Sequence, residues 1–180
     1  KDWKSDASRR DFTINSIYSD KDGNLFDPFN GKQDLENGIV NFIGEPDRRI
    51  KEDYLRILRY LRFFLYYSKQ QHNPENIRKI KINISGILKL SKERLLDELK
   101  KITKLEILER LSKDKISLEI ILMIFPELKN IKIFSRLNST QKDLLKEKDF
   151  IFLLSLMIID DTDNTDYFLY KFNVSKKEQK

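Results

Sequence analysis

The sequence of 180 residues contains no cysteine and only one histidine, His72. Disulfide bonds, thiolate metal sites, thiol nucleophiles and sites built from several histidines are therefore excluded. The lack of cysteine is typical of proteins in a reducing compartment, so we expect a cytoplasmic location. His72 lies in the polar stretch 70–74 and is expected to be an ordinary loop residue.

Long apolar runs are also absent. The longest extends from Phe150 to Ile159, with Ser155 inside it, and is far shorter than the ~20 residues that a membrane-spanning helix needs. Residues 1–4 contain no apolar run, so they do not resemble a secretory signal. We therefore expect a buried helix near 149–159 and no membrane partner.

Charged residues are abundant, and basic residues are in excess. The chain has 35 Lys and Arg against 29 Asp and Glu, a formal net charge of +6 and a pI near 9.3, with 39% hydrophobic residues. These values are typical of a globular protein of one domain or two small ones. The excess of positive charge indicates a polyanionic partner.

The residue pattern predicts a small mixed region followed by helices. Before Gly44-Glu45-Pro46, which should break the chain, we expect a helix at 6–18 with Asp6 as its N-cap and a hairpin around an Asp-Gly turn. The hairpin strands lie near 17–19 and 25–27, and a short helix at 32–37 that stops at Gly38 precedes a strand at 39–43. Later helices are expected at about 51–64, 74–84, 92–103, 104–112, 117–124, 138–147 and 149–159, with N-caps at Asn73 and Ser91, and the tail 175–180 should fray.

The stretch from Lys51 to Phe64 is apolar and basic at once, with helical spacing. Asp53 and Arg56 should lie one turn apart on this helix, with side chains able to project the same way. A carboxylate beside a guanidinium offers an acceptor and donors side by side, which can mimic the Watson–Crick edge of a base. The alternative is a solvent-exposed helix with an ordinary ion pair between residues three apart.

Residues 52–59 resemble the E-D-x-x-R motif of the class II tRNA nucleotidyltransferases (CCA-adding enzymes) and the related bacterial poly(A) polymerases. Residues 9–16, with the sequence RRDFTINS, resemble the R-R-D-[FL]-T-I-N-[AS] motif of the same family. The resemblance covers about residues 1–105. Two further blocks match the family in order and spacing. The first is residues 23–31 together with Asp34-Leu35, and the second is residues 91–94 together with residues 98–101, which match the S-x-E-R…E-x-K-K helix of the family.

The resemblance implies a mainly α fold, in which a small α/β remnant of a nucleotidyltransferase head precedes an all-helical neck and body. The implied domains are the C-terminal part of the head at 1–45, the neck with a nucleotide-template helix at 46–105, and part of the body at 106–180. The implied function is template-independent addition of CCA to tRNA 3′ ends from CTP and ATP. A poly(A) polymerase of the same family and a non-catalytic RNA-binding helical module are the alternatives.

The resemblance also implies roles for residues. Asp53 and Arg56 would select the base, Arg10 would contact the incoming nucleotide and Asp11 would organise its ribose side, while Glu52 would be structural and fix Arg56. The full set expected to bind nucleotide is Arg9, Arg10, Asp11, Asp53, Arg56, Arg59 and Arg62. The tRNA acceptor stem would be held by its backbone. The residues expected to hold it are Arg78, Lys79, Lys92, Arg94, Lys100 and Lys101. The alternative is that these side chains only face solvent.

Mg²⁺ is the implied cofactor, but the metal-binding D-x-D strand of the family does not occur before Arg9. Two D-x-D strings occur elsewhere, at residues 20–22 and 161–163, and both are expected to be solvated turns. We therefore expect no catalytic residue and no metal ligand in this chain, and place the ligands in a preceding segment of a longer protein. The 180 residues alone should then transfer no nucleotide.

Overall fold

The computed structural model describes residues 2–174, and the tail predicted to fray at 175–180 lies outside the described residues. The chain forms two compact units, Lys1–Ile87 and Leu88–Lys180, which are described separately. The predicted domain boundaries near residues 45 and 105 stay predictions. None of the helices in the described part of the chain has both the length and the apolar surface needed to cross a bilayer.

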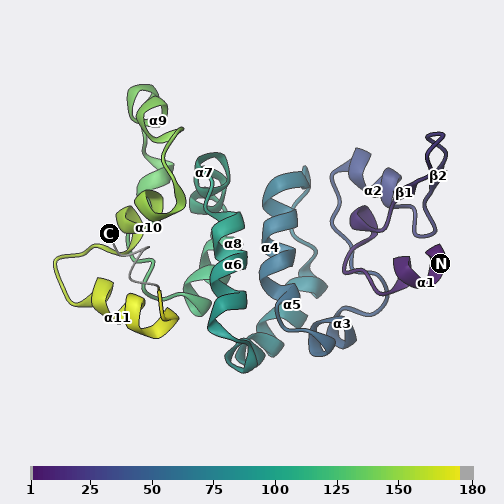
Figure 1. The fold of residues 1–180 in the computed structure, drawn as a ribbon, viewed down its shortest axis with the longest axis horizontal. Helices are drawn as coiled ribbons and strands as arrows, with labels where there is room; N and C mark the ends of the chain where they lie inside the picture. The colour runs from purple at the N-terminus through teal and green to yellow at the C-terminus, as the bar shows by residue number, and fades with distance from the viewer. Residues whose placement is uncertain (1, 175–180) are drawn as a thin grey trace. The chain divides into compact units, whose positions relative to one another are not determined.

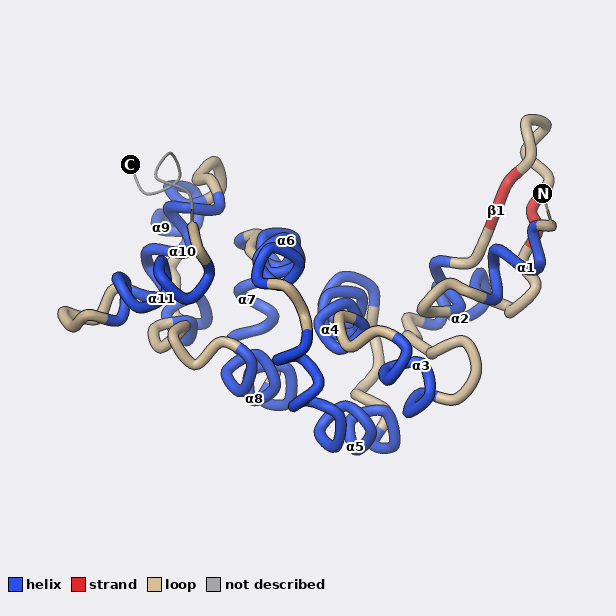
Figure 2. Tube along the Cα trace, turned by 60° about the horizontal axis from the view of Figure 1, so that its bottom comes forward, coloured by secondary structure: helices blue, strands red, loops and turns tan. Residues whose placement is uncertain are grey.

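The first unit begins with short elements around a hairpin (Figure 2). The predicted hairpin is confirmed, since β1 and β2 pair antiparallel with Tyr18 opposite Phe26. The Trp3 ring packs on both strands, with its centroid 6.0 Å from Tyr18 and 5.8 Å from Phe26. The elements are α1 (Trp3–Ser8), the 3-10 helix η1 (Thr13–Asn15), β1 (Tyr18–Ser19), β2 (Leu25–Phe26) and α2 (Gly31–Asn37).

The predicted helix at 6–18 is wrong, because α1 ends at Ser8 and its N-cap is Asp2 rather than Asp6. Phe12 is extended, with φ −128° and ψ 155°, and forms a β-bridge with Phe42. Its ring is fully buried, 5.0 Å from that of Phe42 and 5.1 Å from that of Phe63. Burial of this ring outweighs the local helical pattern. In the described residues this bridge is all the sheet structure formed by the strand expected at 39–43.

Gly38 ends α2, as predicted, in the left-handed conformation with φ 65°. A side chain at this position would also collide with a later part of the chain, since a Cβ on Gly38 would lie 2.5 Å from the backbone nitrogen of Lys69. That nitrogen donates to the Gly38 carbonyl at 2.9 Å. The glycine therefore allows the end of α2 to pack against the backbone at Lys69.

The continuous helix predicted at 51–64 is wrong, because the chain forms two helices with a break at Asp53. Asp53 is extended, with φ −155° and ψ 106°, and its Oδ1 accepts the backbone N–H of Leu55 at 3.1 Å. Such a side-chain bond competes with continuation of a helix. The helices of this part are α3 (Pro46–Glu52), α4 (Arg56–Tyr67) and α5 (Pro74–Asn83), followed by the 3-10 helix η2 (Ile84–Lys89).

The core of the first unit lies along α4, where Ile57, Leu58 and Leu61 are completely buried. His72 belongs to this core and is not the solvated loop residue that the sequence suggested. It is 8% exposed, its Nδ1 lies 3.2 Å from the Tyr60 hydroxyl, and its ring stacks on Phe64 at a centroid distance of 3.5 Å. The polar loop around it thus carries one inward-facing ring.

The second unit is helical in all its regular elements (Figure 1). The predicted helices after residue 91 are confirmed, and Ser91 caps α6 by accepting the Arg94 N–H. The last helix, α11, was not predicted, because its first residues resemble an acidic loop; Asn164 is nevertheless buried and donates to the carbonyls of Glu127 and Ile158. The helices are α6 (Lys92–Ile102), α7 (Leu105–Lys113), α8 (Lys115–Ile124), η3 (Ile131–Ser135), α9 (Ser139–Leu145), α10 (Phe150–Ile158) and α11 (Asn164–Phe172).

The fold is therefore mainly α, with one two-stranded sheet in the described residues, as the sequence predicted.

Candidate functional site

Asp11 is the centre of a buried ionic network in the first unit. Its side chain is 11% exposed and accepts from Nε of Arg56 at 2.8 Å and from Nε of Arg59. The backbone around it is fixed by the neighbouring segment, because Ile43 donates to the Asp11 carbonyl at 3.0 Å. The loop before η1 and the helix α4, 45 residues apart in sequence, are thereby joined through one carboxylate.

Arg56, the first residue of α4, is held on several sides. Besides Asp11, it donates to Glu52 Oε2 at 2.8 Å, to the Arg49 carbonyl at 2.6 Å and to the Arg9 carbonyl at 3.5 Å. Burial opposes its charge, but the bonds to Glu52 and Asp11 outweigh burial and raise the pKa of Arg56. These bonds occupy four of the five guanidinium N–H groups and leave one on Nη2. Glu52 thus fixes Arg56, which is the structural role expected for it.

Arg49 belongs to the same network, although the sequence analysis did not single it out. It donates to Glu52 at 2.6 Å and to the carbonyl of Arg10, and its own carbonyl accepts from Arg56. Its Nε is buried without a hydrogen-bond partner in the described structure. Burial and the nearby charge of Arg56 lower the pKa of Arg49. The available signal was the spacing of Arg49 and Glu52, three residues apart on one helix.

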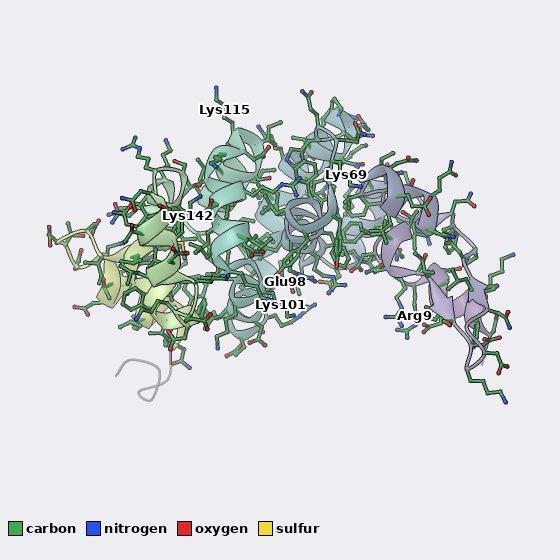
Figure 3. The ribbon with its side chains drawn as sticks, turned by 90° about the horizontal axis from the view of Figure 1, so that it is seen from above. Arg9, Lys69, Glu98, Lys101, Lys115 and Lys142 are labelled. Atoms are coloured by element: carbon green, nitrogen blue, oxygen red, sulfur yellow. The ribbon has the colours of Figure 1, made fainter. Side chains whose placement is uncertain are left out.

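Arg9 and Arg10 direct their side chains to a pocket beside α1, and only their carbonyls reach the network around Asp11. Arg10 donates to the Tyr18 hydroxyl at 3.2 Å and to Asp6 at 2.9 Å. The exposed Arg9, labelled in Figure 3, donates to Asp6 at 2.6 Å. Bonds from Tyr18, Arg10 and Arg9 hold the pKa of Asp6 well below its ordinary value. The pocket has a volume of about 520 Å³ and is lined by Asp2, Trp3, Ser5, Asp6, Arg9, Arg10 and Tyr18.

The expected arrangement of Asp53 and Arg56 is corrected by the structure. They do not share a helix, because Asp53 ends α3 and Arg56 begins α4. They remain adjacent through the backbone, where Arg56 N donates to the Asp53 carbonyl at 3.0 Å. The acceptors of the Arg56 guanidinium in the described structure are Asp11, Glu52 and two carbonyls, rather than Asp53.

The structure brings together Asp11, Arg56 and Arg59, with the backbone of Arg9 and Arg10. The guanidinium carbon of Arg62 lies 4.7 Å from the centre of the Phe63 ring. The roles of all seven residues in nucleotide binding stay predictions.

The residues expected to bind RNA are divided between the two units. In the first unit, Arg78 forms an ion pair with Glu75 at 2.7 Å and Lys79 lies 3.8 Å from the same carboxylate. In the second unit the expected residues lie on α6: Lys92 is 6.0 Å from the centre of the Tyr170 ring, Lys100 is 5.5 Å from that of Phe150, and Lys101 pairs with the buried Glu98 at 3.1 Å (Figure 3). The remaining member, Arg94, also lies on α6.

Among residues 2–174 there is no group of three or more His, Asp or Glu side chains that could hold a metal ion. The Asp20 carboxylate instead accepts the backbone N–H groups of Asp22 and Asn24, as in a tight turn. In the second D-x-D string, Asp161 is left-handed with φ 60° and Asp163 precedes α11.

Comparison with known proteins relates this chain to RNA-processing enzymes. Residues 1–41 match the model of the poly A polymerase head domain. The chain is 50% identical over 103 residues to the human protein named CCA tRNA nucleotidyltransferase 1, mitochondrial; this match covers 56% of the chain and 24% of the human protein. The matched part is thus about a quarter of that relative's length.

The fold resembles solved structures over nearly its whole length. A structure described as a tRNA-processing enzyme in an apo form matches 99% of this chain and 55% of its own, with a TM-score of 0.73 and 25% identity. The Bacillus stearothermophilus CCA-adding enzyme in complex with CTP matches 98% of this chain and 44% of its own, with a TM-score of 0.63 and 22% identity. At that identity the second likeness shows the fold alone.

Proposed function

We propose that this chain, which is related to the class II CCA-adding enzymes, carries the nucleotide-selecting part of an enzyme that adds C, C and A to tRNA 3′ ends from CTP and ATP. The observation that carries the proposal is the fixed position of Arg56. Its guanidinium is held by Asp11, Glu52 and two carbonyls, which leave one N–H on Nη2, and its backbone N–H donates to the carbonyl of Asp53.

In this proposal Asp53 and Arg56 read the edge of the base. A carboxylate accepts from an exocyclic amine, which adenine and cytosine share and guanine and uracil lack at the corresponding position. A guanidinium N–H donates to the adjacent ring nitrogen. For a wrong base these groups are left unsatisfied, which costs about 1–3 kcal/mol each and suffices for discrimination.

The remaining arginines would neutralise the triphosphate. Phosphoryl-type transfer depends mainly on positioning and on charge stabilisation, so guanidinium groups around the phosphates supply much of what the protein contributes. Arg9 and Arg10 line a pocket with room for phosphate groups. Arg59, which is bonded to Asp11, would be the third arginine to bind the triphosphate. Asp11 holds two of the arginines in place, and its expected contact on the ribose side remains part of the proposal.

The proposed reaction uses Mg²⁺, but the described residues do not fit a site for it, since they form no suitable cluster of ligands. We derive no step through the metal, and propose that its ligands come from elsewhere in the enzyme and that the 180 residues alone transfer no nucleotide. The proposed RNA partner is the 3′ end and acceptor stem of tRNA. A cytoplasmic location stays a prediction, since the human relative is named as mitochondrial.

A poly(A) polymerase is the second candidate, because the match at residues 1–41 is to the head domain of that name. The two candidates differ in their use of CTP. Incorporation of CMP before AMP into a tRNA without its 3′ CCA would support the first, whereas repeated incorporation of AMP alone would support the second.

The test of base selection uses Asp53→Asn in the intact protein. Arg56→Ala is less clean, because it removes four hydrogen bonds and leaves Asp11 with one partner fewer. Asn keeps an oxygen that can accept from Leu55 but removes the charge. We expect the preference for CTP and ATP over GTP and UTP to fall about tenfold, which is about 1.4 kcal/mol, with an unchanged melting temperature.

The matched control is Asp22→Asn in the exposed hairpin turn, which should leave the preference unchanged. Incorporation of all four nucleotides by the wild type and both variants decides the matter. An unaltered preference in Asp53→Asn would refute the assignment of Asp53 as a base-reading group.

A further inference from the structure

Asp6 connects the two arginines of the pocket beside α1. Its Oδ1 accepts from Nε of Arg9 at 2.6 Å, and its Oδ2 accepts from Nη2 of Arg10 at 2.9 Å. The Tyr18 hydroxyl closes a ring of bonds, because it donates to Asp6 Oδ2 at 2.5 Å and accepts from Nε of Arg10 at 3.2 Å. None of these bonds in the described structure uses Nη1 of either arginine, so this end of each guanidinium remains for a ligand.

The partners of the Asp6 carboxylate are themselves fixed. The Tyr18 ring lies 6.0 Å from that of Trp3 and 6.5 Å from that of Phe26, its partner across the hairpin. The backbone carbonyls of the two arginines accept from the ionic network around Asp11. Each arginine is therefore held at its backbone by one set of contacts and at its guanidinium by another.

Two carboxylates line this pocket, and their contacts differ. Asp2 caps α1, since its Oδ1 accepts the backbone N–H of Lys4 at 3.0 Å, and none of the described arginines bonds to it. Asp6 bonds to both arginines of the pocket. A carboxylate that only lined the pocket would repel a triphosphate, so the contacts of Asp6 require another explanation.

We propose that Asp6, together with the Tyr18 hydroxyl, is a positioning residue for the arginines that bind the triphosphate of CTP or ATP. A long side chain loses conformational freedom when it binds a phosphate, and this loss weakens binding. Arginines that Asp6 has already ordered in the free protein lose less, so the triphosphate binds more tightly. The inference rests on the proposed function, in which the two arginines of this pocket bind the phosphates.

The test compares Asp6→Asn with Asp2→Asn in the intact protein. Each variant removes one negative charge from the same pocket, and Asn can still cap a helix at position 2. If Asp6 only repelled the ligand, Asp6→Asn would bind CTP more tightly. As a positioning residue, its replacement should weaken the binding of CTP about tenfold, because two long side chains are no longer ordered in advance. Asp2→Asn should bind CTP at least as tightly as the wild type. Calorimetry measures these affinities.

Cytidine separates positioning from packing, because it carries the base and the ribose but no phosphate. Its binding, followed by NMR titration, should be the same in Asp6→Asn and in the wild type. Tyr18→Phe removes the hydroxyl but keeps the ring, and should weaken the binding of CTP about threefold without an effect on cytidine.

Three results would overturn the positioning role of Asp6. They are equal or tighter binding of CTP by Asp6→Asn, an equal loss of affinity in Asp2→Asn, and an equal loss for cytidine and CTP in Asp6→Asn. The last result, with a lowered melting temperature, would assign Asp6 to packing.

The affinities of the wild type for all four nucleoside triphosphates distinguish a failure of this inference from a failure of the proposed function. If the wild type bound GTP and UTP as tightly as CTP and ATP, while Asp6→Asn weakened the binding of all four, the proposed base selection would be refuted and the positioning role would stand. If the wild type preferred CTP and ATP, and Asp6→Asn bound them equally well, only the positioning role would be refuted.

Discussion

The two units of this chain use charged side chains in different ways. Residues 1–87 hold eight of the eleven arginines, and their carboxylates are shared. Asp11 binds Arg56 and Arg59, and Glu52 lies within ion-pair distance of Arg48, Arg49 and Arg56. Residues 88–180 are rich in lysine, and the ion pairs described there join one lysine to one acid, as in Lys142–Glu109 at 2.7 Å and Lys129–Asp160 at 2.6 Å (Figure 3).

The difference follows from the chemistry of the two cations. A guanidinium is planar and offers five N–H groups in a fixed fork, so one arginine can bridge several acceptors from different segments. An ammonium group is a compact charge on a flexible stem and usually makes one pair near the surface. The first unit therefore uses charge to position a site, while the second keeps its charges around an apolar core that includes Phe125, Phe134 and Phe168.

The largest expected effect is on the stability of the first unit. Asp11→Asn removes the charge that Arg56 and Arg59 share and leaves buried cations with less compensation. We expect the free energy of unfolding to fall by about 3–5 kcal/mol. The matched variant in the second unit, Glu109→Gln, breaks a partly exposed pair and should cost less than about 1 kcal/mol.

Urea denaturation of the intact protein, followed by probes in each unit, compares the two losses. Equal losses would break the distinction between a shared network and isolated pairs.

The next effect concerns phosphate binding. Arg10→Lys or Arg59→Lys replaces a fork by a point charge and should weaken the binding of CTP and ATP about tenfold, without changing the preference between bases. Arg136→Lys, on an exposed position of the second unit, serves as the control and should have no effect. Nucleotide binding measured by calorimetry checks this, and a loss of base preference without loss of affinity would contradict it.

A smaller effect is expected in the salt dependence of RNA binding. If α6 holds the RNA backbone, Lys92→Gln and Lys100→Gln should each reduce the slope of log affinity against log salt by about 1. Arg78→Gln in the first unit should change the slope less, because Arg78 is already paired with Glu75. Titrations of an RNA hairpin that carries a single-stranded 3′ tail, at several salt concentrations, give the slopes. Unchanged slopes in the α6 variants would show that these lysines only face solvent.

The smallest effect is a change in acid titration. The hydrogen bond from Arg56 is the main cause that lowers the pKa of Glu52. A lowered folded pKa means that the stabilisation from Glu52 is present above the unfolded pKa and is lost as the pH falls through the folded one. Arg56→Lys should move the pKa of Glu52 back toward its ordinary value, as followed by carboxyl NMR.

Glu93 in the second unit is the comparison for this titration. Its own backbone N–H and the side chain of Ser91 lower its pKa at the start of α6. Arg56→Lys should leave it unchanged, and a parallel shift of both carboxyls would contradict the assignment to a local pair.

Much of the fold could be predicted from local patterns. The Asp-Gly turn of the hairpin, the stop at Gly38 and the caps at Asn73 and Ser91 depend on a few neighbouring residues, and the structure confirms each of them. The helices of the second unit up to α10 were also found, since their apolar positions follow helical spacing. Here the local preference and the tertiary environment agree.

Three of the errors share a cause, because in each a tertiary contact outweighs the local pattern. Phe12 pairs with Phe42 and ends a predicted helix early. His72 is drawn into the core by Tyr60 and Phe64. Asn164 bonds two carbonyls and starts a helix in what looked like an acidic loop. These partners lie too far along the chain for a periodicity argument to include them.

The same division holds for the candidate site. The residue types and their order along the chain, with Arg9, Arg10 and Asp11 in one motif and Asp53 and Arg56 in another, are legible in the sequence by resemblance to a family. That Asp11 holds Arg56 and Arg59, and that Arg49 joins them, were decided by tertiary structure, whereas the helix break at Asp53 goes with a local bond from its side chain to the Leu55 N–H. A motif specifies which groups are available, but a buried guanidinium takes its direction from all the acceptors around it, and those of Arg56 come from two separate segments, 9–11 and 49–52.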